Sequence, residues 1–228
     1  MDAPCSGQER SPAAPLLSFP DLTGLGITGA ITLRVPGIDV RGSKQEVMPR
    51  LDSAIRAAAT QLAPGRALVT AEQVHGAGVA VVGEAREREV PECDALVTLR
   101  RDVVLAIAVA DCCPVWLVDD AARGLALVHA GRRGMELAIV PAAVAVLCRE
   151  TGVPARRVRA FLGPCIRPPH YEVDVAGGIK DQLAAAGVRQ VADCGLDTAS
   201  DPGRFYSYRI EKGRTGRMMA LGALAVGR

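Results

Sequence analysis

Short runs of consecutive apolar residues alternate along the chain with segments of helical periodicity. The runs are rich in Val, Ile and Leu and are bounded by Gly, Pro or polar residues, so each predicts a buried β-strand. The predicted strands cover residues 27–35, two segments within 67–82, and 94–98, 103–110, 115–118, 124–128 and 157–162.

Four other segments place their apolar residues on one side of a helix. The clearest runs from Ser43 to Leu62, where Pro64-Gly65 ends it. Three further helices are predicted over residues 134–151, 174–186 and 215–226. Strands interleaved with helices predict a mixed α/β (α+β) fold, a layered sandwich of mixed β-sheet with flanking helices.

The predicted elements show no internal repeat and no convincing linker. We therefore expect one domain over residues 21–228. Residues 1–20 are rich in Pro, Ser and Ala, which predicts a disordered N-terminal tail.

The composition argues against a nucleic-acid-binding, membrane-spanning or disulfide-rich secreted protein. The 27 basic and 25 acidic residues give a net charge of +2, which offers no reason to expect nucleic acid as a partner. The longest apolar run, residues 103–110, is too short to span a membrane, and the N-terminus lacks the pattern of a signal peptide. Seven cysteines without dense spacing argue against a disulfide scaffold. We expect a cytoplasmic protein with reduced thiols and no membrane or nucleic-acid partner.

Three residues of metal-ligand type, His75, Cys112 and His129, stand in apolar segments punctuated by Gly or Pro. The segments are Gln73-Val-His-Gly76, Ala110-Asp-Cys-Cys-Pro-Val115 and Val128-His-Ala-Gly-Arg-Arg-Gly134. Two imidazoles and one thiolate match the protein ligands of a catalytic zinc, whose fourth position stays open. The alternative is a small core Cys and two structural His residues, because no two ligands show the short spacing of common zinc motifs.

The segment Asp111-Cys-Cys-Pro114 interrupts two apolar runs. Pro114 restricts Cys113 to extended geometry and breaks the strand pairing, so a turn there can expose one thiol. A nearby metal or imidazolium would lower the pKa of that thiol. A simple Pro-induced bend with two buried thiols is the alternative.

Two segments could bind an anion or a nucleotide-like ligand. Residues 129–134 join a predicted strand to a predicted helix. The backbone amides at the helix start, together with Arg132 and Arg133, suit a phosphate. The alternative is a Gly-hinged connection with solvated arginines. Residues 206–217 combine tyrosines with a run of cations, although such a run is more often a solvated face. The Pro-rich turn at 161–173, which contains Tyr171, is expected to shape a pocket wall or close a core.

The order of these segments resembles the laccase-domain family, also named the multicopper polyphenol oxidoreductase or peptidoglycan editing factor family. The resemblance covers roughly residues 65–225. The remaining matching motifs are Asp-Ala-Leu-Val-Thr at 94–98, Gly-Pro-Cys-Ile at 163–166, Tyr-Glu-Val at 171–173, Phe-Tyr-Ser-Tyr-Arg at 205–209 and Thr-Gly-Arg-Met at 215–218.

The resemblance implies that His75, Cys112 and His129 bind one zinc ion, with copper as the less favoured metal. It implies the fold of the cytotoxic necrotizing factor catalytic domain. It also implies a zinc-dependent purine nucleoside phosphorylase that acts with inorganic phosphate on adenosine, inosine, guanosine and methylthioadenosine, with accompanying adenosine deaminase activity. Family members usually have Trp where Arg132 stands, which places a cation at that point of the substrate pocket.

Phosphorolysis needs both substrates held together, charge stabilised as the glycosidic bond breaks, and a proton for the leaving purine. The residues that we assign to catalysis are Asp94, Asp111 and Arg133. Those assigned to substrate and phosphate binding are Gln73, Arg133, Tyr171 and Arg209. An Asp beside a zinc-ligand His could instead only orient it. A monomer or a homodimer is expected.

Other functions remain open. A multicopper oxidase needs about ten His ligands, since imidazole is the usual copper ligand, whereas this chain has three histidines. A cysteine hydrolase or amidase would use Cys112 as nucleophile and His129 as base, which fits the peptidoglycan-editing name. A metal-stabilised binding module would bind metal without turnover and lose its fold on chelation.

Overall fold

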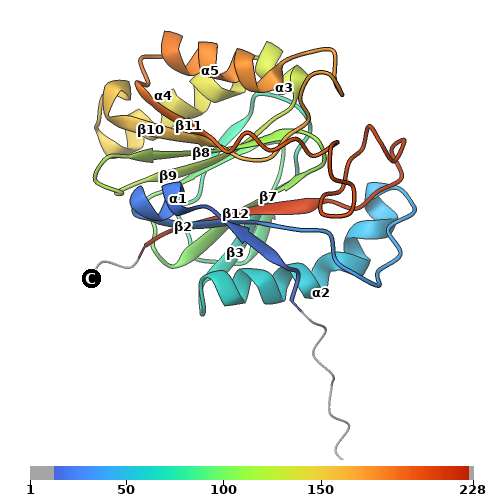
Figure 1. Ribbon diagram of the computed structural model, residues 1–228. Helices are drawn as coiled ribbons and strands as arrows, with labels where there is room; N and C mark the ends of the chain where they lie inside the picture. Colours follow the sequence, from blue (N-terminus) through green and yellow to red (C-terminus); the bar gives the residue numbers. More distant parts are fainter. Residues whose placement is uncertain (1–12, 226–228) are drawn as a thin grey trace, which may run out of the picture.

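Two six-stranded β-sheets pack face to face in the computed structural model, which describes residues 13–225 (Figure 1). The first sheet has the strand order β1-β2-β12-β7-β3-β5, with β1 (Leu16–Ser18), β2 (Ile27–Thr32), β12 (Met218–Leu224), β7 (Val103–Val109), β3 (Ala67–Ala71) and β5 (Arg88–Val90). The second has the order β11-β10-β8-β9-β6-β4, with β11 (Gln190–Asp193), β10 (Val158–Leu162), β8 (Cys113–Asp119), β9 (Leu125–Ala130), β6 (Ala95–Thr98) and β4 (Val79–Val81).

Helices cover both outer faces of this sandwich. In Figure 1, α2 lies below the first sheet, and α3, α4 and α5 lie above the second. The helices are α1 (Pro20–Gly24), α2 (Lys44–Leu62), α3 (Arg132–Glu136), α4 (Ile139–Thr151) and α5 (Val175–Ala185), with a 3-10 turn at Ala155–Arg157. Both sheets contain parallel and antiparallel pairs, so the predicted mixed α/β layered fold is confirmed.

The second sheet is buried on both faces, which explains its continuous apolar runs. All seven residues of β8 are buried. Trp116 belongs to the core between the sheets, whereas Val115 and Leu117 belong to the core under α4 and α5. The indole Nε1 of Trp116 donates a hydrogen bond to the carbonyl oxygen of Leu221 in β12, 3.0 Å away, and so joins the two sheets.

Helix α2 begins where the sequence predicts. Ser43 accepts a hydrogen bond from the Glu46 backbone amide, while the Glu46 carboxylate accepts one from the Ser43 amide. This capping box satisfies two amides that have no partner within the helix. Its buried residues form the apolar side that packs on the first sheet.

The predicted C-terminal helix over 215–226 is wrong. Residues 218–224 form β12, the third strand of the first sheet, hydrogen-bonded to β2 and β7 on either side. Every residue of β12 is buried, so the segment has no polar face to fix its period, and a short apolar run fits a strand or a helix equally well. The predicted helix over 134–151 is interrupted at Ala138, which adopts a left-handed conformation between α3 and α4.

Three short edge elements were not predicted. They are β1, β5 and β11, each of three or four residues. Strand β1 lies within the segment predicted as a disordered tail, and its pairing with β2 corrects that prediction for residues 16–18. The part of the predicted tail at residues 1–12 lies outside the described residues.

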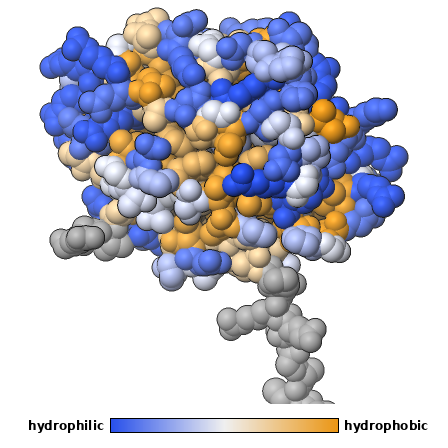
Figure 2. Space-filling model, viewed as in Figure 1, coloured by the Kyte–Doolittle hydropathy of each residue, from blue (hydrophilic) through white to orange (hydrophobic). Residues whose placement is uncertain are grey.

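The surface separates polar rims from an apolar centre. Figure 2 shows hydrophilic residues over the helical layers and apolar side chains gathered across the middle of this face, between the layers.

Among the helices of residues 13–225, none combines the length and the apolar content that crossing a bilayer requires. The chain crosses from the first sheet to the second after β3, after β5 and after β7, and the first and last of these crossings carry His75 and Cys112.

Candidate metal centre

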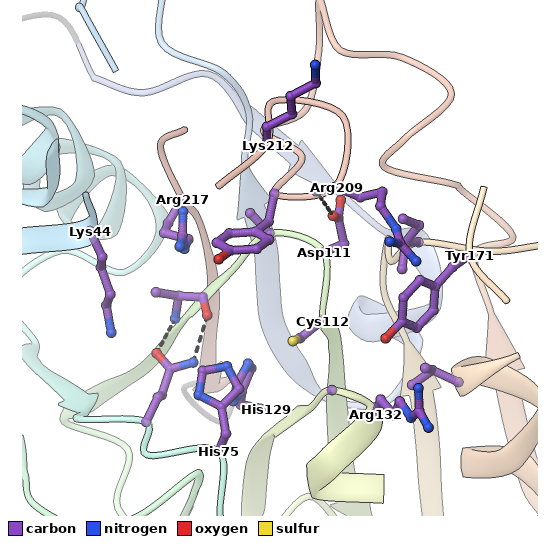
Figure 3. Close-up of a pocket in the computed structure, with 17 residues that line it drawn as sticks. Lys44, His75, Asp111, Cys112, His129, Arg132, Tyr171, Arg209, Lys212 and Arg217 are labelled. Atoms are coloured by element: carbon purple, nitrogen blue, oxygen red, sulfur yellow. Dashed lines mark hydrogen bonds between the residues drawn. The ribbon is translucent and has the colours of Figure 1, made fainter. Parts of the chain in front are cut away.

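His75, Cys112 and His129 converge at one end of the sandwich. His75 lies in the loop between β3 and β4, Cys112 between β7 and β8, and His129 in β9. One ligand atom from each side chain lies within 4.8 Å of the other two. The two imidazole rings are 5.0 Å apart between centroids and nearly perpendicular, and Figure 3 shows both below the Cys112 sulfur. The structure therefore brings together the three residues predicted as ligands.

The Asp94 carboxylate lies behind His129 and accepts hydrogen bonds that hold this cluster in place. Its Oδ1 atom lies 2.8 Å from Nδ1 of His129 and also accepts the backbone amide of His75 at 3.0 Å. Its Oδ2 accepts the amide of Gly76 at 2.7 Å, and the side chain is fully buried. Because a carboxylate only accepts, Nδ1 of His129 carries the proton and Nε2 is left for a ligand.

Asp94 also stabilises the unusual backbone of His75. His75 adopts φ 58°, in the left-handed region that non-Gly residues seldom occupy. The two hydrogen bonds from residues 75 and 76 to one carboxylate offset the cost of that conformation. Burial by itself would raise the pKa of Asp94, but its hydrogen bonds to His129, Gly76 and His75 outweigh burial and lower the pKa.

Without a metal the Cys112–His129 pair is ionised. Burial raises the pKa of the Cys112 thiol, but hydrogen bonds and charge from His129 and His75 outweigh it and bring the pKa to about 6. Burial likewise opposes the protonation of His129, yet its hydrogen bonds to Asp94 and Cys112 raise its pKa to about 9. Cys112 is therefore a thiolate near neutral pH, which is the form that binds metal.

Gly131 makes room for the thiolate. A Cβ atom at Gly131 would lie 2.5 Å from Sγ of Cys112, closer than non-bonded atoms approach. Cys113, the neighbouring thiol, is instead fully buried under the helices of the second sheet. The prediction that this turn exposes one thiol is confirmed, with Cys112 half-buried at the cavity, although Pro114 lies within β8 rather than breaking it.

The donor set fits a single metal ion. One thiolate and two imidazole nitrogens are ligands that zinc prefers in tetrahedral sites, and three protein ligands leave one position for a substrate. The nearby Asp94 supplies the carboxylate that commonly supports a ligating His. In residues 13–225 this is the single His, Cys, Asp or Glu cluster with metal-site geometry.

The cluster forms part of the wall of a cavity of about 660 Å³. That volume is suited to a small organic ligand. Its cationic lining residues are Lys44, Arg132, Arg209, Lys212 and Arg217. Two tyrosines, Tyr171 and Tyr208, add aromatic surface. The cavity is therefore positively charged and partly aromatic (Figure 3).

Two of the predicted site residues line the cavity but direct their polar atoms to the protein. Gln73 donates through Nε2 to the carbonyl oxygen of Ala108 and accepts the Ala108 amide through Oε1, both at 2.7 Å. Asp111 accepts from the Thr198 hydroxyl at 2.7 Å and from the Arg209 amide at 2.9 Å. Both side chains thus hold loops in place around the cavity.

Tyr171 and Arg209, which the sequence analysis assigns to substrate binding, lie together in one wall of the cavity. The Arg209 guanidinium lies 4.8 Å from the centre of the Tyr171 ring. Arg209 also pairs with Glu172, and Arg132 lies 3.8 Å from the other oxygen of the same carboxylate. Arg132 forms a second ion pair with Glu136.

Arg133 is not placed where the sequence suggested. It is exposed at the start of α3 and does not line the cavity, whereas its neighbour Arg132 does. Asp94 also lies outside the lining, behind His129. The sequence pattern shows a cationic stretch near the C-terminus but does not single out Lys212 or Arg217, and it gives no signal for Lys44, at the start of α2.

Sequence comparison relates this chain to known proteins. The sequence matches a family model described as "Multi-copper polyphenol oxidoreductase laccase" over residues 37–177 and 173–225. A purine nucleoside phosphorylase of Streptomyces coelicolor is 35% identical over 178 residues, covering 66% of this chain and 72% of the relative. A purine nucleoside phosphorylase of Deinococcus radiodurans is 30% identical and covers 92% of this chain and 93% of its own length.

Solved structures agree in fold. The hypothetical protein YfiH of Bacillus licheniformis matches with a TM-score of 0.76 at 22% identity, covering 93% of this chain and 97% of that one. YlmD of Geobacillus stearothermophilus also gives a TM-score of 0.76, at 24% identity, with 91% and 94% covered. By its sequence match, this chain belongs to the multi-copper polyphenol oxidoreductase laccase family.

Proposed function

We propose that this protein is a zinc-dependent enzyme that cleaves purine nucleosides by phosphorolysis. The observation that carries the proposal is the convergence of His75, Cys112 and His129 on a cationic, partly aromatic cavity. Relatives that carry the name purine nucleoside phosphorylase support the reaction and its substrate class. A multicopper reaction is disfavoured, because three histidines cannot supply the ligands of several copper ions.

In this reaction a phosphate oxygen forms a bond to the sugar C1′ atom while the bond from C1′ to the purine nitrogen breaks. The purine leaves with the bonding electrons and takes up a proton. Zinc held by the three ligands would supply Lewis-acid stabilisation of developing negative charge. The protein's own contribution is to hold the two substrates together and to exclude most of the water from the cavity.

Four of the predicted site residues receive roles that follow from their contacts. Asp94 holds His129 in the ligating tautomer and fixes the His75 loop. Asp111 holds the Arg209 backbone at the cavity wall, and the Arg209 side chain covers one face of Tyr171. The remaining aromatic surface of the cavity is offered to the purine, because base stacking on aromatic rings tolerates different purines.

The proposed substrates are adenosine, inosine, guanosine and methylthioadenosine. Deamination of adenosine is proposed as a second activity of the same centre, because replacing the exocyclic amine at purine C6 needs a water molecule activated near zinc. The two activities differ in one requirement: phosphorolysis depends on phosphate, and deamination does not.

The test is product analysis by chromatography. Zinc-loaded protein is incubated with adenosine with and without phosphate, beside a Cys112→Ala variant and a Cys148→Ala control, whose thiol lies on α4 away from the cavity. We expect phosphate-dependent adenine release by the wild type and the control, with loss in Cys112→Ala. Absence of turnover for all four nucleosides despite stoichiometric zinc would reject the proposal.

A second candidate function rests on the contact between Cys112 and His129. The low pKa of the thiol, the adjacent imidazole and Asp94 behind it make the arrangement of a cysteine hydrolase. This function requires a metal-free thiolate, since coordination to zinc blunts a nucleophile. Hydrolysis of an amide or ester substrate by metal-free protein, inhibited by added zinc, would favour the hydrolase over the nucleoside enzyme.

A further inference from the structure

Arg217 differs from the other arginines of the cavity in having no carboxylate partner. Arg132 and Arg209 each pair with glutamates, whereas within residues 13–225 no ion pair is formed by Arg217. Its Nη1 atom donates to the carbonyl oxygens of Thr215 and Gly216, at 3.0 and 2.9 Å. These two bonds anchor one end of the guanidinium and leave its other nitrogen donors without a protein acceptor in the described chain.

The position of Arg217 is fixed by its surroundings. It extends from the residue just before β12, the buried third strand of the first sheet, and its guanidinium lies 5.6 Å from the centre of the Tyr208 ring. Tyr208 in turn lies against Gly213, where a Cβ atom would come within 3.1 Å of the ring. A guanidinium with few accessible rotamers loses little entropy when it binds a ligand.

The charge of Arg217 is not neutralised by its neighbours. Burial lowers its pKa, and the acidic neighbours that oppose this effect include Cys112, Asp111 and Glu211, none of which it hydrogen-bonds. An arginine nevertheless stays protonated in proteins. When Cys112 binds a zinc ion, its negative charge is taken up by the metal. A charged, half-buried guanidinium beside the metal centre then favours an anion in the cavity.

The two sides of the cavity differ in character. In Figure 3, Arg217 and Lys44 lie on one side of Cys112, and Tyr171 and Arg132 lie on the other. The second side carries the stacked Tyr171–Arg209 pair and the Glu172 carboxylate, which would repel a dianion. On the first side, neither Arg217 nor Lys44 has a carboxylate partner within residues 13–225, and the Lys44 ammonium donates to the carbonyl oxygen of Glu72.

We propose that Arg217 binds the phosphate cosubstrate and holds it beside the metal centre, opposite the Tyr171 wall. This inference rests on the proposed phosphorolysis and assigns the phosphate to residues other than Arg133. Within residues 13–225 the Nε and Nη2 atoms of Arg217 donate to no acceptor, so they can bind two phosphate oxygens, a geometry that a planar guanidinium favours. Phosphate bound there leaves the aromatic wall free for the purine.

The first test measures binding without turnover. Isothermal titration of zinc-loaded protein with inorganic phosphate is compared for the wild type, Arg217→Gln, Arg217→Lys and a control, Arg189→Gln, which removes an exposed arginine outside the cavity. Loss of one charged hydrogen-bonding group weakens binding about ten- to hundredfold. We expect that loss in Arg217→Gln, a smaller loss in Arg217→Lys, and unchanged binding in the control.

Titration with adenosine 5′-monophosphate separates two sources of the same phosphate group. If free phosphate is the natural ligand, inorganic phosphate should bind the wild type and should bind Arg217→Gln more weakly. Arg217-dependent binding of the nucleotide together with no binding of inorganic phosphate would overturn the assignment. This measurement decides the inference even if the wild type turns over no nucleoside, so its failure is distinct from failure of the proposed function.

Steady-state kinetics then separate phosphate binding from a structural role. We expect Arg217→Gln to raise KM for phosphate about ten- to hundredfold and to raise KM for adenosine far less. If Arg217 only caps the carbonyl oxygens of residues 215 and 216, the variant would lower the melting temperature and leave KM for phosphate unchanged. That result would overturn the inference.

Discussion

The two parts of the candidate site are built in different ways. The floor, which comprises His75, Asp94, Cys112 and His129, lies on β9 and on the loops that follow β3, β5 and β7, and hydrogen bonds to one fully buried carboxylate hold it in place. The rim, which comprises Arg132, Tyr171, Glu172, Arg209 and Lys212, lies in loops and at a helix end, and its ion pairs are exposed. A buried network fixes geometry, whereas exposed pairs contribute little stability. The floor is thus suited to rigid metal chemistry and the rim to admitting different ligands.

The largest expected effect comes from removing the carboxylate beneath the floor. Asp94→Ala leaves the buried His129 and two backbone amides without their acceptor, so we expect a loss of about 3–5 kcal/mol in the free energy of unfolding. Urea denaturation of metal-free protein measures it. Asp120→Ala, which removes a carboxylate from an exposed ion pair with Arg157, is the control and should change stability far less. Equal effects of the two variants would contradict the distinction between floor and rim.

A second variant displaces a ligand without removing it. Gly131→Ala places a methyl group 2.5 Å from Sγ of Cys112, so the thiolate must move. We expect zinc affinity to fall about ten- to hundredfold, the range seen when the support of a ligand is disturbed. Competition with a chromophoric chelator measures the affinity. Gly83→Ala is the matched control because an added Cβ there meets nothing within 4 Å.

The pH dependence of thiol alkylation probes the electrostatics of the floor. In metal-free protein the pKa of Cys112 is about 6 instead of the ordinary 9.0, so its thiolate is present above that pH and is lost as the pH falls through about 6. Iodoacetamide labelling of Cys112 should reach half its maximal rate near pH 6, as followed by mass spectrometry of peptides. Burial raises the pKa of Cys148, so its labelling should still be rising above pH 8.5. Coincident profiles would show that the imidazoles do not ionise Cys112.

The smallest effect is expected at the rim. Glu172→Gln removes the partner of Arg209 and a neighbour of Arg132, yet all three side chains are about half exposed. We expect the free energy of unfolding to change by less than about 1 kcal/mol. KM for phosphate should fall slightly, because the cavity loses a negative charge. A destabilisation as large as that of Asp94→Ala would show that the rim is structurally rigid after all.

The sequence predicts the floor better than the rim for a physical reason. His75, Cys112 and His129 are rare residue types embedded in apolar strand ends, so both their chemistry and their placement leave a signal. Arginines are common on surfaces, and nothing in the local pattern distinguishes Arg132, which lines the cavity, from Arg133, which does not. Lys44 comes near the site only because α2 packs across the first sheet, a tertiary relation that local spacing does not contain.

The fold shows the same difference between features that local residues determine and features that depend on distant partners. Strands bounded by Gly and Pro, and a helix with a capping box, follow from local residues and are confirmed. The local sequence predicts a helix where β12 lies, because a segment buried on both faces has no polar period. Its neighbours β2 and β7 are distant in the sequence, so local spacing gives no sign of the pairing. The role of Asp94 behind His129, rather than in the cavity, likewise depends on pairing between β6 and β9.

The chain crossings between the sheets have a consequence for biogenesis. His75 and Cys112 lie on two separate crossings, and His129 lies on a strand of the second sheet, so the ligand set is brought together only by segments that belong to both sheets. High-affinity metal capture must therefore wait until both sheets have docked. Uptake of the ion would then report the completion of folding, and a misassembled chain would stay in its metal-free form.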